Sequence, residues 1–336
     1  MSISNSRSGM SVFTLLLMSS SMQVTCLAAE PATVPDAIVN AIHDGYCRRA
    51  LEQLQPLMAA HAKDAEYQFQ YGQALLGAGR LDEALTAMKA AVALVPDDGI
   101  YHRGLGDVYG AQTFQASMFS MYGLAKSTLG EYQAAVRLAP GDAASHVDLA
   151  TYYIMAPGIA GGSLDKAHVE EAALDKLDPV QALQVRAQEA AQDKDAAKAE
   201  SLYKQAAAAD KTTRSLVALG LFYVDAARYP ESLQVFRDAT ARDATSWLAW
   251  YQIGKVAGLS HSAYAEGVAA LQRYLGADLP DGVPTPAWAH FRLGNLYEYQ
   301  GERPQASAEY READRLKGAD KTLAGELGKK DLGTMK

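Results

Sequence analysis

Seven histidines are the residues of this chain best suited to acid–base or metal chemistry, because imidazole titrates near neutral pH and ligates metals. They are His43, His61, His102, His146, His168, His261 and His290. No HExxH pair occurs, and the run His168-Val-Glu-Glu171 lacks a second histidine one helical turn away. His102 and His290 stand where Trp250 stands in a related segment, which favours packing. The sequence therefore predicts no metal site.

Glycine-rich and nucleophile motifs are also incomplete. Gly104-Leu-Gly106 followed by Gly110 has the wrong last spacing for a dinucleotide fingerprint. The stretch from Gly158 to Lys166 lacks the Gly-Lys-Ser/Thr of a phosphate loop, and no GxSxG is present. We expect no catalytic residues and no cofactor, and an enzyme would need a site that no motif marks.

Composition points to a folded protein that does not bind nucleic acid. Of 336 residues, 49% are apolar and 21% are charged, as in ordinary globular chains. Lys and Arg number 31 against 39 Asp and Glu, a net charge of -8. Because no basic excess is available to neutralise phosphates, we exclude nucleic acid from the expected partners.

Residues 1–29 have the parts of a secretory signal peptide. Arg7 is followed by the apolar run Val12–Met18 and then by Cys26-Leu-Ala-Ala29, a small-residue exit. We expect cleavage near Ala29 and an exported, periplasmic protein with no membrane span after signal removal. The alternative is a lipoprotein anchored through Cys26, although Gln23-Val24-Thr25 fits a lipidation box poorly.

Cys47 is the only cysteine that remains after removal of the signal. An unpaired cysteine in an exported protein is either a buried small hydrophobe or a free thiol. A helix-like run follows Cys47, and we therefore predict that it is buried.

The remainder of the chain repeats with a period of about 34 residues. A small residue, glycine or alanine, recurs at one position of each unit, at intervals of 34, 44, 37, 33, 34 and 40 residues. These positions are Gly72, Gly106, Ala150, Ala187, Gly220, Gly254 and Gly294. Each small residue would let two helices of one unit approach closely.

Several positions of the repeat unit hold the same type of residue in more than one unit. The unit at 287–318 has Leu293-Gly294, then Tyr297, then Ala306, Tyr310 and Ala313, and Trp250 stands at the start of the preceding unit. This pattern resembles the tetratricopeptide repeat. The resemblance implies an all-α, right-handed superhelical solenoid of antiparallel helix pairs with a concave groove.

We divide the chain at the repeats. Residues 30–64 form N-terminal helices or a degenerate repeat, with helices near 35–44 and 48–62. Seven repeats cover 65–318, and 319–336 form a C-terminal capping segment. The prolines expected to end second helices are Pro96, Pro140, Pro179 and Pro280.

Two units carry insertions, near 110–128 and 156–163. Insertions in a solenoid form loops or longer helices on one face, often the binding face. For the first insertion we favour a plainer interpretation, in which it extends both helices and its aromatic side chains pack together.

The first helix of each unit is expected to line the concave side. In the last two units this predicts an aromatic groove with polar edges, a composition typical of peptide-binding hot spots. Its residues are Tyr251, Lys255, Trp288, Phe291, Asn295, Glu298 and Tyr299. In the alternative, Phe291 and Tyr299 pack under the C-terminal segment. The two-carboxylate clamp of chaperone-binding repeats is not supported, because the Lys partners of Asn295 are missing.

These observations predict a non-catalytic scaffold or adaptor in the bacterial envelope that binds a protein or peptide. A structural subunit of an envelope or secretion assembly is the main alternative, and an unrecognised enzyme is a third. A structural subunit would expose an apolar patch outside the groove, whereas an adaptor would gather aromatic residues inside it.

Overall fold

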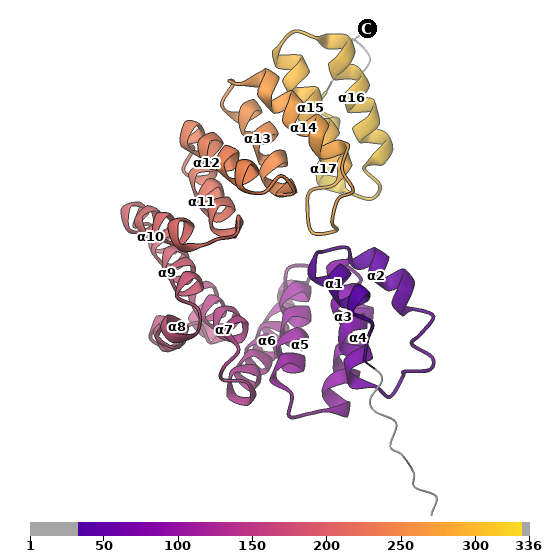
Figure 1. Ribbon diagram of the computed structural model, residues 1–336, viewed down its shortest axis with the longest axis vertical. Helices are drawn as coiled ribbons and strands as arrows, with labels where there is room; N and C mark the ends of the chain where they lie inside the picture. Colours follow the sequence, from indigo (N-terminus) through magenta and orange to yellow (C-terminus); the bar gives the residue numbers. More distant parts are fainter. Residues whose placement is uncertain (1–32, 331–336) are drawn as a thin grey trace, which may run out of the picture. The chain divides into compact units, whose positions relative to one another are not determined.

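The computed structural model describes residues 33–330, and every regular element in that range is helical (Figure 1). The helices are α1 (Asp36–His43), α2 (Cys47–Leu54), α3 (Ala65–Gly77), α4 (Leu81–Leu94), α5 (Gly99–Thr113), α6 (Met118–Leu138), α7 (Ala143–Met155), the 3-10 turn η1 (Gly158–Ala160), α8 (Leu164–Leu177), α9 (Pro179–Gln192), α10 (Ala196–Ala209), α11 (Arg214–Asp225), α12 (Tyr229–Arg242), α13 (Trp247–Leu259), α14 (Tyr264–Leu275), α15 (Pro286–Tyr299), α16 (Arg303–Leu316) and α17 (Lys321–Leu327). The predicted signal segment, with Cys26, lies outside the described residues. None of the described helices is both long enough and apolar enough to span a bilayer.

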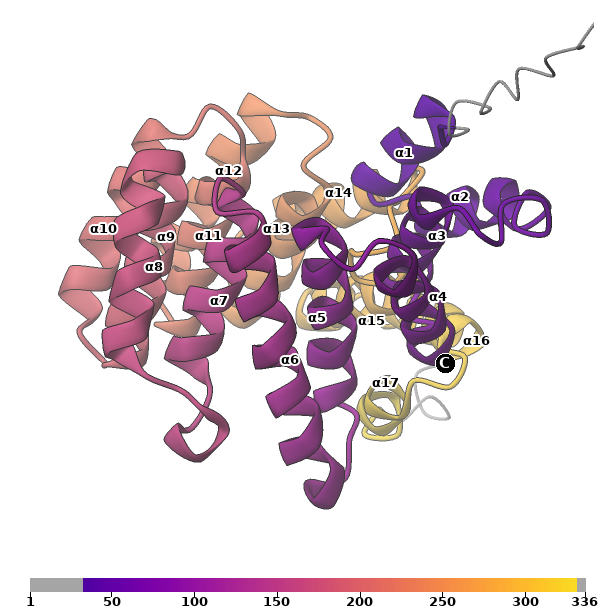
Figure 2. The ribbon, with the colours of Figure 1, turned by 90° about the horizontal axis from the view of Figure 1, so that it is seen from below.

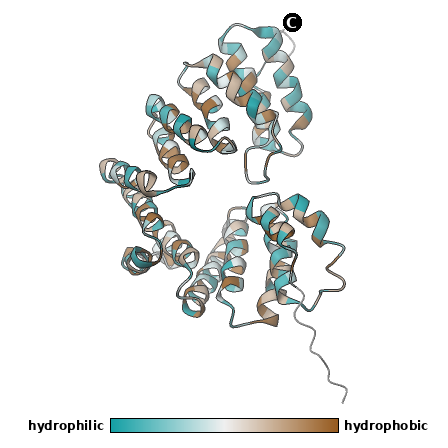
Figure 3. Ribbon diagram, in the orientation of Figure 1, coloured by the Kyte–Doolittle hydropathy of each residue, from teal (hydrophilic) through white to brown (hydrophobic). Residues whose placement is uncertain are grey.

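Seven helix pairs, from α3–α4 to α15–α16, correspond to the predicted repeats, and each helix packs against the next one along the chain. The helices have a hydrophobic and a hydrophilic side (Figure 3). One pair cannot bury its apolar side alone, so stacking of neighbouring pairs forms the core. The all-α solenoid is therefore confirmed. The pair α1–α2 precedes the repeats, and α2 ends at Leu54, earlier than expected.

In the five repeats whose small residue is glycine, that glycine lies against a large side chain of the partner helix. A Cβ at Gly220 would lie 2.5 Å from Cε1 of Phe236, and one at Gly294 would lie 2.6 Å from Cε1 of Tyr310. Real Cβ atoms do not approach other atoms this closely. Ser232 Oγ also donates a hydrogen bond to the carbonyl oxygen of Gly220 at 3.0 Å. The repeated glycine is thus required by the distance between the paired helices.

Pro96, Pro140 and Pro179 each lie two residues after the end of a second helix (α4, α6 and α8), as expected, and Pro179 has a further role. Pro179 is the first residue of α9, and Asp178 before it accepts hydrogen bonds from Val180 N and Gln181 N. Proline suits this position because the first N–H groups of a helix have no intrahelical acceptor. Pro280 lies in the loop between α14 and α15, next to Asp281, which contacts the N-terminal pair.

The loop before α15 contacts the α1–α2 turn, more than 200 residues away in the chain (Figure 1). Asp281 N donates to the carbonyl oxygen of Gly45 at 2.8 Å, and Tyr46 OH donates to the carbonyl oxygen of Asp278 at 3.1 Å. Arg49 Nη2 pairs with Asp278 Oδ2 at 2.6 Å. These contacts explain the length of this interrepeat loop.

Cys47 is buried at the start of α2, as predicted, with 5% of the residue exposed. It packs against Gly77, where an added Cβ would lie 2.2 Å from its sulfur. Burial, and to a smaller extent Asp281, raises the pKa of the thiol. The residue therefore acts as a small core side chain.

Replacement of Gly220 by leucine is expected to destabilise the chain by about 1–3 kcal/mol or more, because the new side chain must displace Phe236 from the core. Denaturant unfolding would measure the loss, and hydrogen exchange would locate it in the repeats around α11 and α12. Gly130→Leu is the matched control, because Gly130 lies on an exposed face with no neighbour within 4 Å. Equal stability of the two variants would show that the close approach does not constrain the fold.

Candidate functional site

Two aromatic side chains of the groove predicted for the last two units are buried inside the protein. Phe291 is only 3% exposed and packs with Tyr310, Leu323 and Leu327, so α17 covers it. Tyr251 is 5% exposed and lies against Tyr274, with ring centroids 5.6 Å apart. The expectation that these two aromatic side chains face a groove is therefore wrong. The alternative, in which Phe291 and Tyr299 pack under the C-terminal segment, is correct for Phe291 but not for Tyr299, which lies beside His261 and Tyr264.

The polar residues of this predicted groove bond to their own chain. Tyr310 OH donates to Asn295 Oδ1 at 2.7 Å and to Glu298 Oε2 at 2.6 Å. Glu298 also pairs with Lys330 Nζ at 2.6 Å. Trp288 Nε1 donates to Asp320 Oδ2 at 2.8 Å, which ties α15 to the start of α17. These hydrogen bonds hold the C-terminal helices together.

Five of the seven predicted residues are not buried: Lys255, Trp288, Asn295, Glu298 and Tyr299. Tyr299 is 44% exposed, next to the rings of His261 and Tyr264. Lys255 is half-buried, and burial together with the charge of Arg292 lowers the pKa of its ammonium group. A binding role for these five residues stays a prediction.

The two insertions, which lie in neighbouring repeats, line one large apolar hollow. The first insertion lengthens α5 and α6, and α6 runs for 21 residues beside α5 and α7 (Figure 2). The second forms the loop that contains η1, after α7. The hollow has a volume of ≈ 650 Å³, which is within the usual range for a ligand site. Its lining, which we call the insertion groove, is Gly110, Thr113, Phe114, Met121, Tyr122, Ala125, Thr128, Tyr132, Asp148, Thr151, Tyr152, Met155, Ala156, Pro157, Ile159, Ala160 and Gln188.

Large apolar side chains of the insertions are exposed to solvent. Phe114 is 93% exposed, Phe119 at the start of α6 is 99% exposed, and Ile159 is 82% exposed. The expected lengthening of both helices is therefore correct, but the expected packing of the aromatic side chains on one another is wrong for Phe114 and Phe119. Gathered apolar side chains of this kind mark surfaces that a partner covers.

A buried polar network supports the floor of the insertion groove. Tyr132 OH donates to Asp107 Oδ1 at 2.9 Å, and Arg103 Nη1 lies 3.8 Å from Asp148 Oδ2. Burial and the neighbouring Asp107 raise the pKa of Asp148 to about 7, although Arg103 opposes the shift. Burial likewise raises the pKa of Asp107. Asp148 is the one carboxyl in the lining of the insertion groove.

The insertion groove continues along the following repeats. Thr151 and Gln188 are shared with a smaller hollow of ≈ 160 Å³, between α7, α9 and α11. Tyr203 and Ala218 connect that hollow to a third of ≈ 480 Å³, beside Phe222. This continuous surface therefore runs across several repeat units, as the binding site of an extended peptide segment would.

Three glutamines on α9 line the middle of this surface: Gln181, Gln184 and Gln188. Their spacing places them on one side of the helix. Gln181 Nε2 donates to Asp178 Oδ2 at 2.9 Å, and Gln184 Nε2 donates to Ser215 Oγ at 2.5 Å. These bonds orient the amides, whose oxygens can accept hydrogen bonds from the backbone N–H groups of a ligand.

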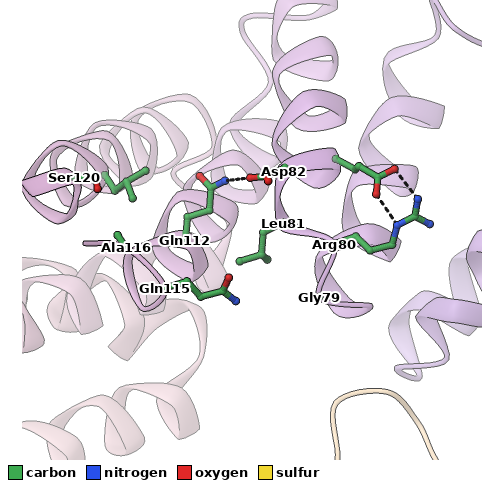
Figure 4. Close-up of a pocket in the computed structure, with 10 residues that line it drawn as sticks. Gly79, Arg80, Leu81, Asp82, Gln112, Gln115, Ala116 and Ser120 are labelled. Atoms are coloured by element: carbon green, nitrogen blue, oxygen red, sulfur yellow. Dashed lines mark hydrogen bonds and ion pairs between the residues drawn. The ribbon is translucent and has the colours of Figure 1, made fainter. Parts of the chain in front are cut away.

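A separate hollow between α4 and the α5–α6 connection is more polar (Figure 4). Its volume is ≈ 540 Å³, and Gln112 Nε2 donates to Asp82 Oδ1 across it at 3.1 Å. Arg80 pairs with Glu83 at 2.6 Å. Because its charged groups are already paired and it holds few apolar side chains, it is the weaker candidate site.

Comparison with known proteins agrees with the repeat architecture. Residues 65–108, which span α3, α4 and part of α5, match the family model of the tetratricopeptide repeat. The chain contains tetratricopeptide repeats. No curated protein gives a significant match.

Solved structures with this fold share little sequence with the chain. The human IFIT1 dimer with m7Gppp-AAAA aligns with a TM-score of 0.54 and 17% identity, over 87% of this chain and 70% of that one. Cut9–Hcn1, an APC/C hetero-tetramer, aligns with a TM-score of 0.51 and 13% identity, over 87% and 47%. A thermophilic tetratricopeptide protein of Thermus thermophilus aligns with a TM-score of 0.42 and 19% identity, over 66% and 95%. The two structures with TM-scores above 0.5 show only that this chain shares their fold. The fold is typical of non-catalytic protein-interaction scaffolds.

Sequence reasoning found the insertions but did not identify their shared groove. The sequence feature that could have predicted this groove is the presence of insertions in two neighbouring repeats. One insertion is rich in aromatic residues and the other is rich in glycine. Adjacent repeats stack, so insertions in them can meet. The polar network that includes Asp148 forms only when the fold brings its side chains together, and no sequence motif marks it.

Replacement of Asp148 by asparagine is expected to reduce the dependence of stability on pH. The carboxyl ionises near pH 3.8 when unfolded but at about pH 7 when folded. The folded state thus binds more protons between these values, and the free energy of unfolding from this group decreases as pH rises from about 4 to about 7. Denaturant titrations across this window would measure the slope, with Asp238→Asn on an exposed face as the control. An unchanged slope in the Asp148 variant would contradict this assignment.

Proposed function

We propose that this protein is a non-catalytic scaffold of the bacterial cell envelope that binds an extended segment of a partner protein in the insertion groove. The observation that carries the proposal is the continuity of the surface, from the exposed Phe114 and Ile159 across Gln188 to Tyr203. An extended peptide needs apolar pockets for side chains and polar groups for its backbone, and this surface offers both.

The charges of the groove specify the partner segment further. Asp148 is the ionisable carboxyl at the apolar end, and no Lys or Arg lines that end. A segment with apolar side chains and a neutral or basic neighbour is therefore favoured over an acidic segment. The same charges, together with the net charge of -8, argue against RNA as the ligand. IFIT1 shares the fold, but the m7Gppp-AAAA in its structure is a property of that protein alone.

The exposed apolar residues gather outside the groove predicted for the last two units, as a structural subunit would have them, but they border a hollow that one chain segment can fill, and we therefore favour a scaffold. Phe114, Phe119 and Ile159, each more than 80% exposed, belong to the two insertions. Those farther away, such as Val169 on α8 and Leu316 on α16, occur singly. Single exposed apolar residues are normal on a soluble surface, whereas a gathered set indicates an interaction site.

Peptide capture would test the groove. The probes are fluorescent peptides of about a dozen residues that carry apolar side chains beside neutral, basic or acidic ones. Phe114→Ser and Ile159→Ser are each expected to weaken binding about tenfold, the loss that corresponds to about 1.4 kcal/mol at an interface anchor. Both side chains are exposed, so the fold should be unaffected.

Val169→Ser is the matched control, because Val169 is 66% exposed but does not line the groove. Tyr299→Ser tests the groove predicted for the last two units. Equal binding by all four variants and the parent chain would refute the insertion groove as the peptide site. Loss of binding only with Tyr299→Ser would move the site to the C-terminal repeats.

Export is supported by Arg7, the run Val12–Met18 and the small-residue exit at Ala28 and Ala29. The mature chain is expected to begin near Ala29 or Glu30 in the periplasmic fraction. N-terminal sequencing of fractionated protein would measure this. A chain in the cytosol that begins at Met1 would contradict export, and a lipid on Cys26 would establish an anchored form.

A further inference from the structure

Among residues 33–330, one group of side chains outside the groove combines an imidazole with two carboxylates. His168 and Glu171 lie three residues apart on α8, so they share one side of that helix. Glu189 reaches them from α9, and the candidate ligand atoms all lie within 4.8 Å of one another. His168 Nε2 and Glu189 Oε1 are 2.8 Å apart. We propose that His168, Glu171 and Glu189 bind a divalent transition-metal ion of the zinc type.

The independent observation that points to a ligand is an unsatisfied buried oxygen. Glu171 is 4% exposed, and its Oε1 atom is buried without any hydrogen-bond partner. Its other oxygen accepts a hydrogen bond from Arg186 Nε at 3.2 Å. A buried carboxylate oxygen left without a partner is costly, and a bound cation would remove that cost.

The charges around the group also match a divalent cation. Arg186 uses both terminal nitrogens on Asp175, each at 2.8 Å, so that these two residues largely neutralise each other. The remaining carboxylates are those of Glu171 and Glu189, both buried. Two carboxylates and a neutral imidazole balance a doubly charged ion.

The ligand set favours zinc-type ions over calcium or magnesium. Zinc accepts imidazole nitrogen and carboxylate oxygen at about 2.0–2.2 Å and commonly uses three protein ligands plus water. Calcium and magnesium prefer oxygen ligands alone, so they gain little from His168. The side chain of His168 is 53% exposed, which leaves a path for the ion from solvent.

The other histidine–glutamate pairs within the described part of the chain lack these features. His102 bonds Glu131 at 2.6 Å, and its second ring nitrogen is bonded to the carbonyl oxygen of Pro96. His290 bonds Glu309 at 2.6 Å without a third ligand group nearby. These pairs are structural, and they supply internal controls for a metal-binding experiment.

The test uses the mature chain without a histidine tag, stripped with EDTA and titrated with zinc chloride in a calorimeter. We expect one zinc ion per chain. His168→Ala and Glu171→Gln should each weaken binding at least about tenfold, since loss of even an outer partner of a metal ligand has an effect of this size. His290→Ala should bind zinc as the parent chain does, and excess magnesium chloride should not compete.

Circular dichroism would verify that each variant is folded, and the exposed position of His168 makes its substitution the decisive one. Zinc binding that His168→Ala leaves unchanged would overturn the proposal, as would an absence of zinc uptake by the folded parent chain. Equal loss in His168→Ala and His290→Ala would also overturn it, because binding would then not depend on this group.

Discussion

The close approach of two helices within each repeat is the constraint on which the rest of the structure depends. Gly220 against Phe236 and Gly294 against Tyr310 leave no room for a Cβ atom. The large side chain of the second helix fills the space above the glycine and excludes water there. Because each pair then presents apolar side chains to the next, the same local contact allows the whole stack to form.

The proposed binding surface lies where this regular packing is interrupted. A regular repeat buries its apolar side chains against its neighbours, so it leaves little apolar surface for a partner. The insertions add residues that the stack cannot bury, and Phe114 and Ile159 remain exposed beside a hollow of ≈ 650 Å³. The polar floor below, with Asp148 and Arg103, gives this surface a preference for charge as well as shape.

The two candidate sites lie in adjacent repeats but use different physical effects. The insertion groove offers apolar area and oriented amides, which suit a flexible chain segment. The group of His168, Glu171 and Glu189 offers buried negative charge, which suits a small cation. Substitution of one exposed residue, Phe114 in the groove or His168 in the metal group, should impair binding at that site. The glycine contacts that hold the repeats together would not change.

The sequence by itself determined the repeat, its register and the class of fold, because the glycine contacts are local and recur at nearly constant spacing. It also marked both insertions and the burial of Cys47. Only the tertiary structure decided which surfaces are exposed. Phe291 has the type and spacing of a groove residue, yet α17 covers it. Glu189 joins His168 and Glu171 only because α9 packs on α8. Such contacts depend on which elements meet in space, and a periodic pattern within one helix pair carries no information about them.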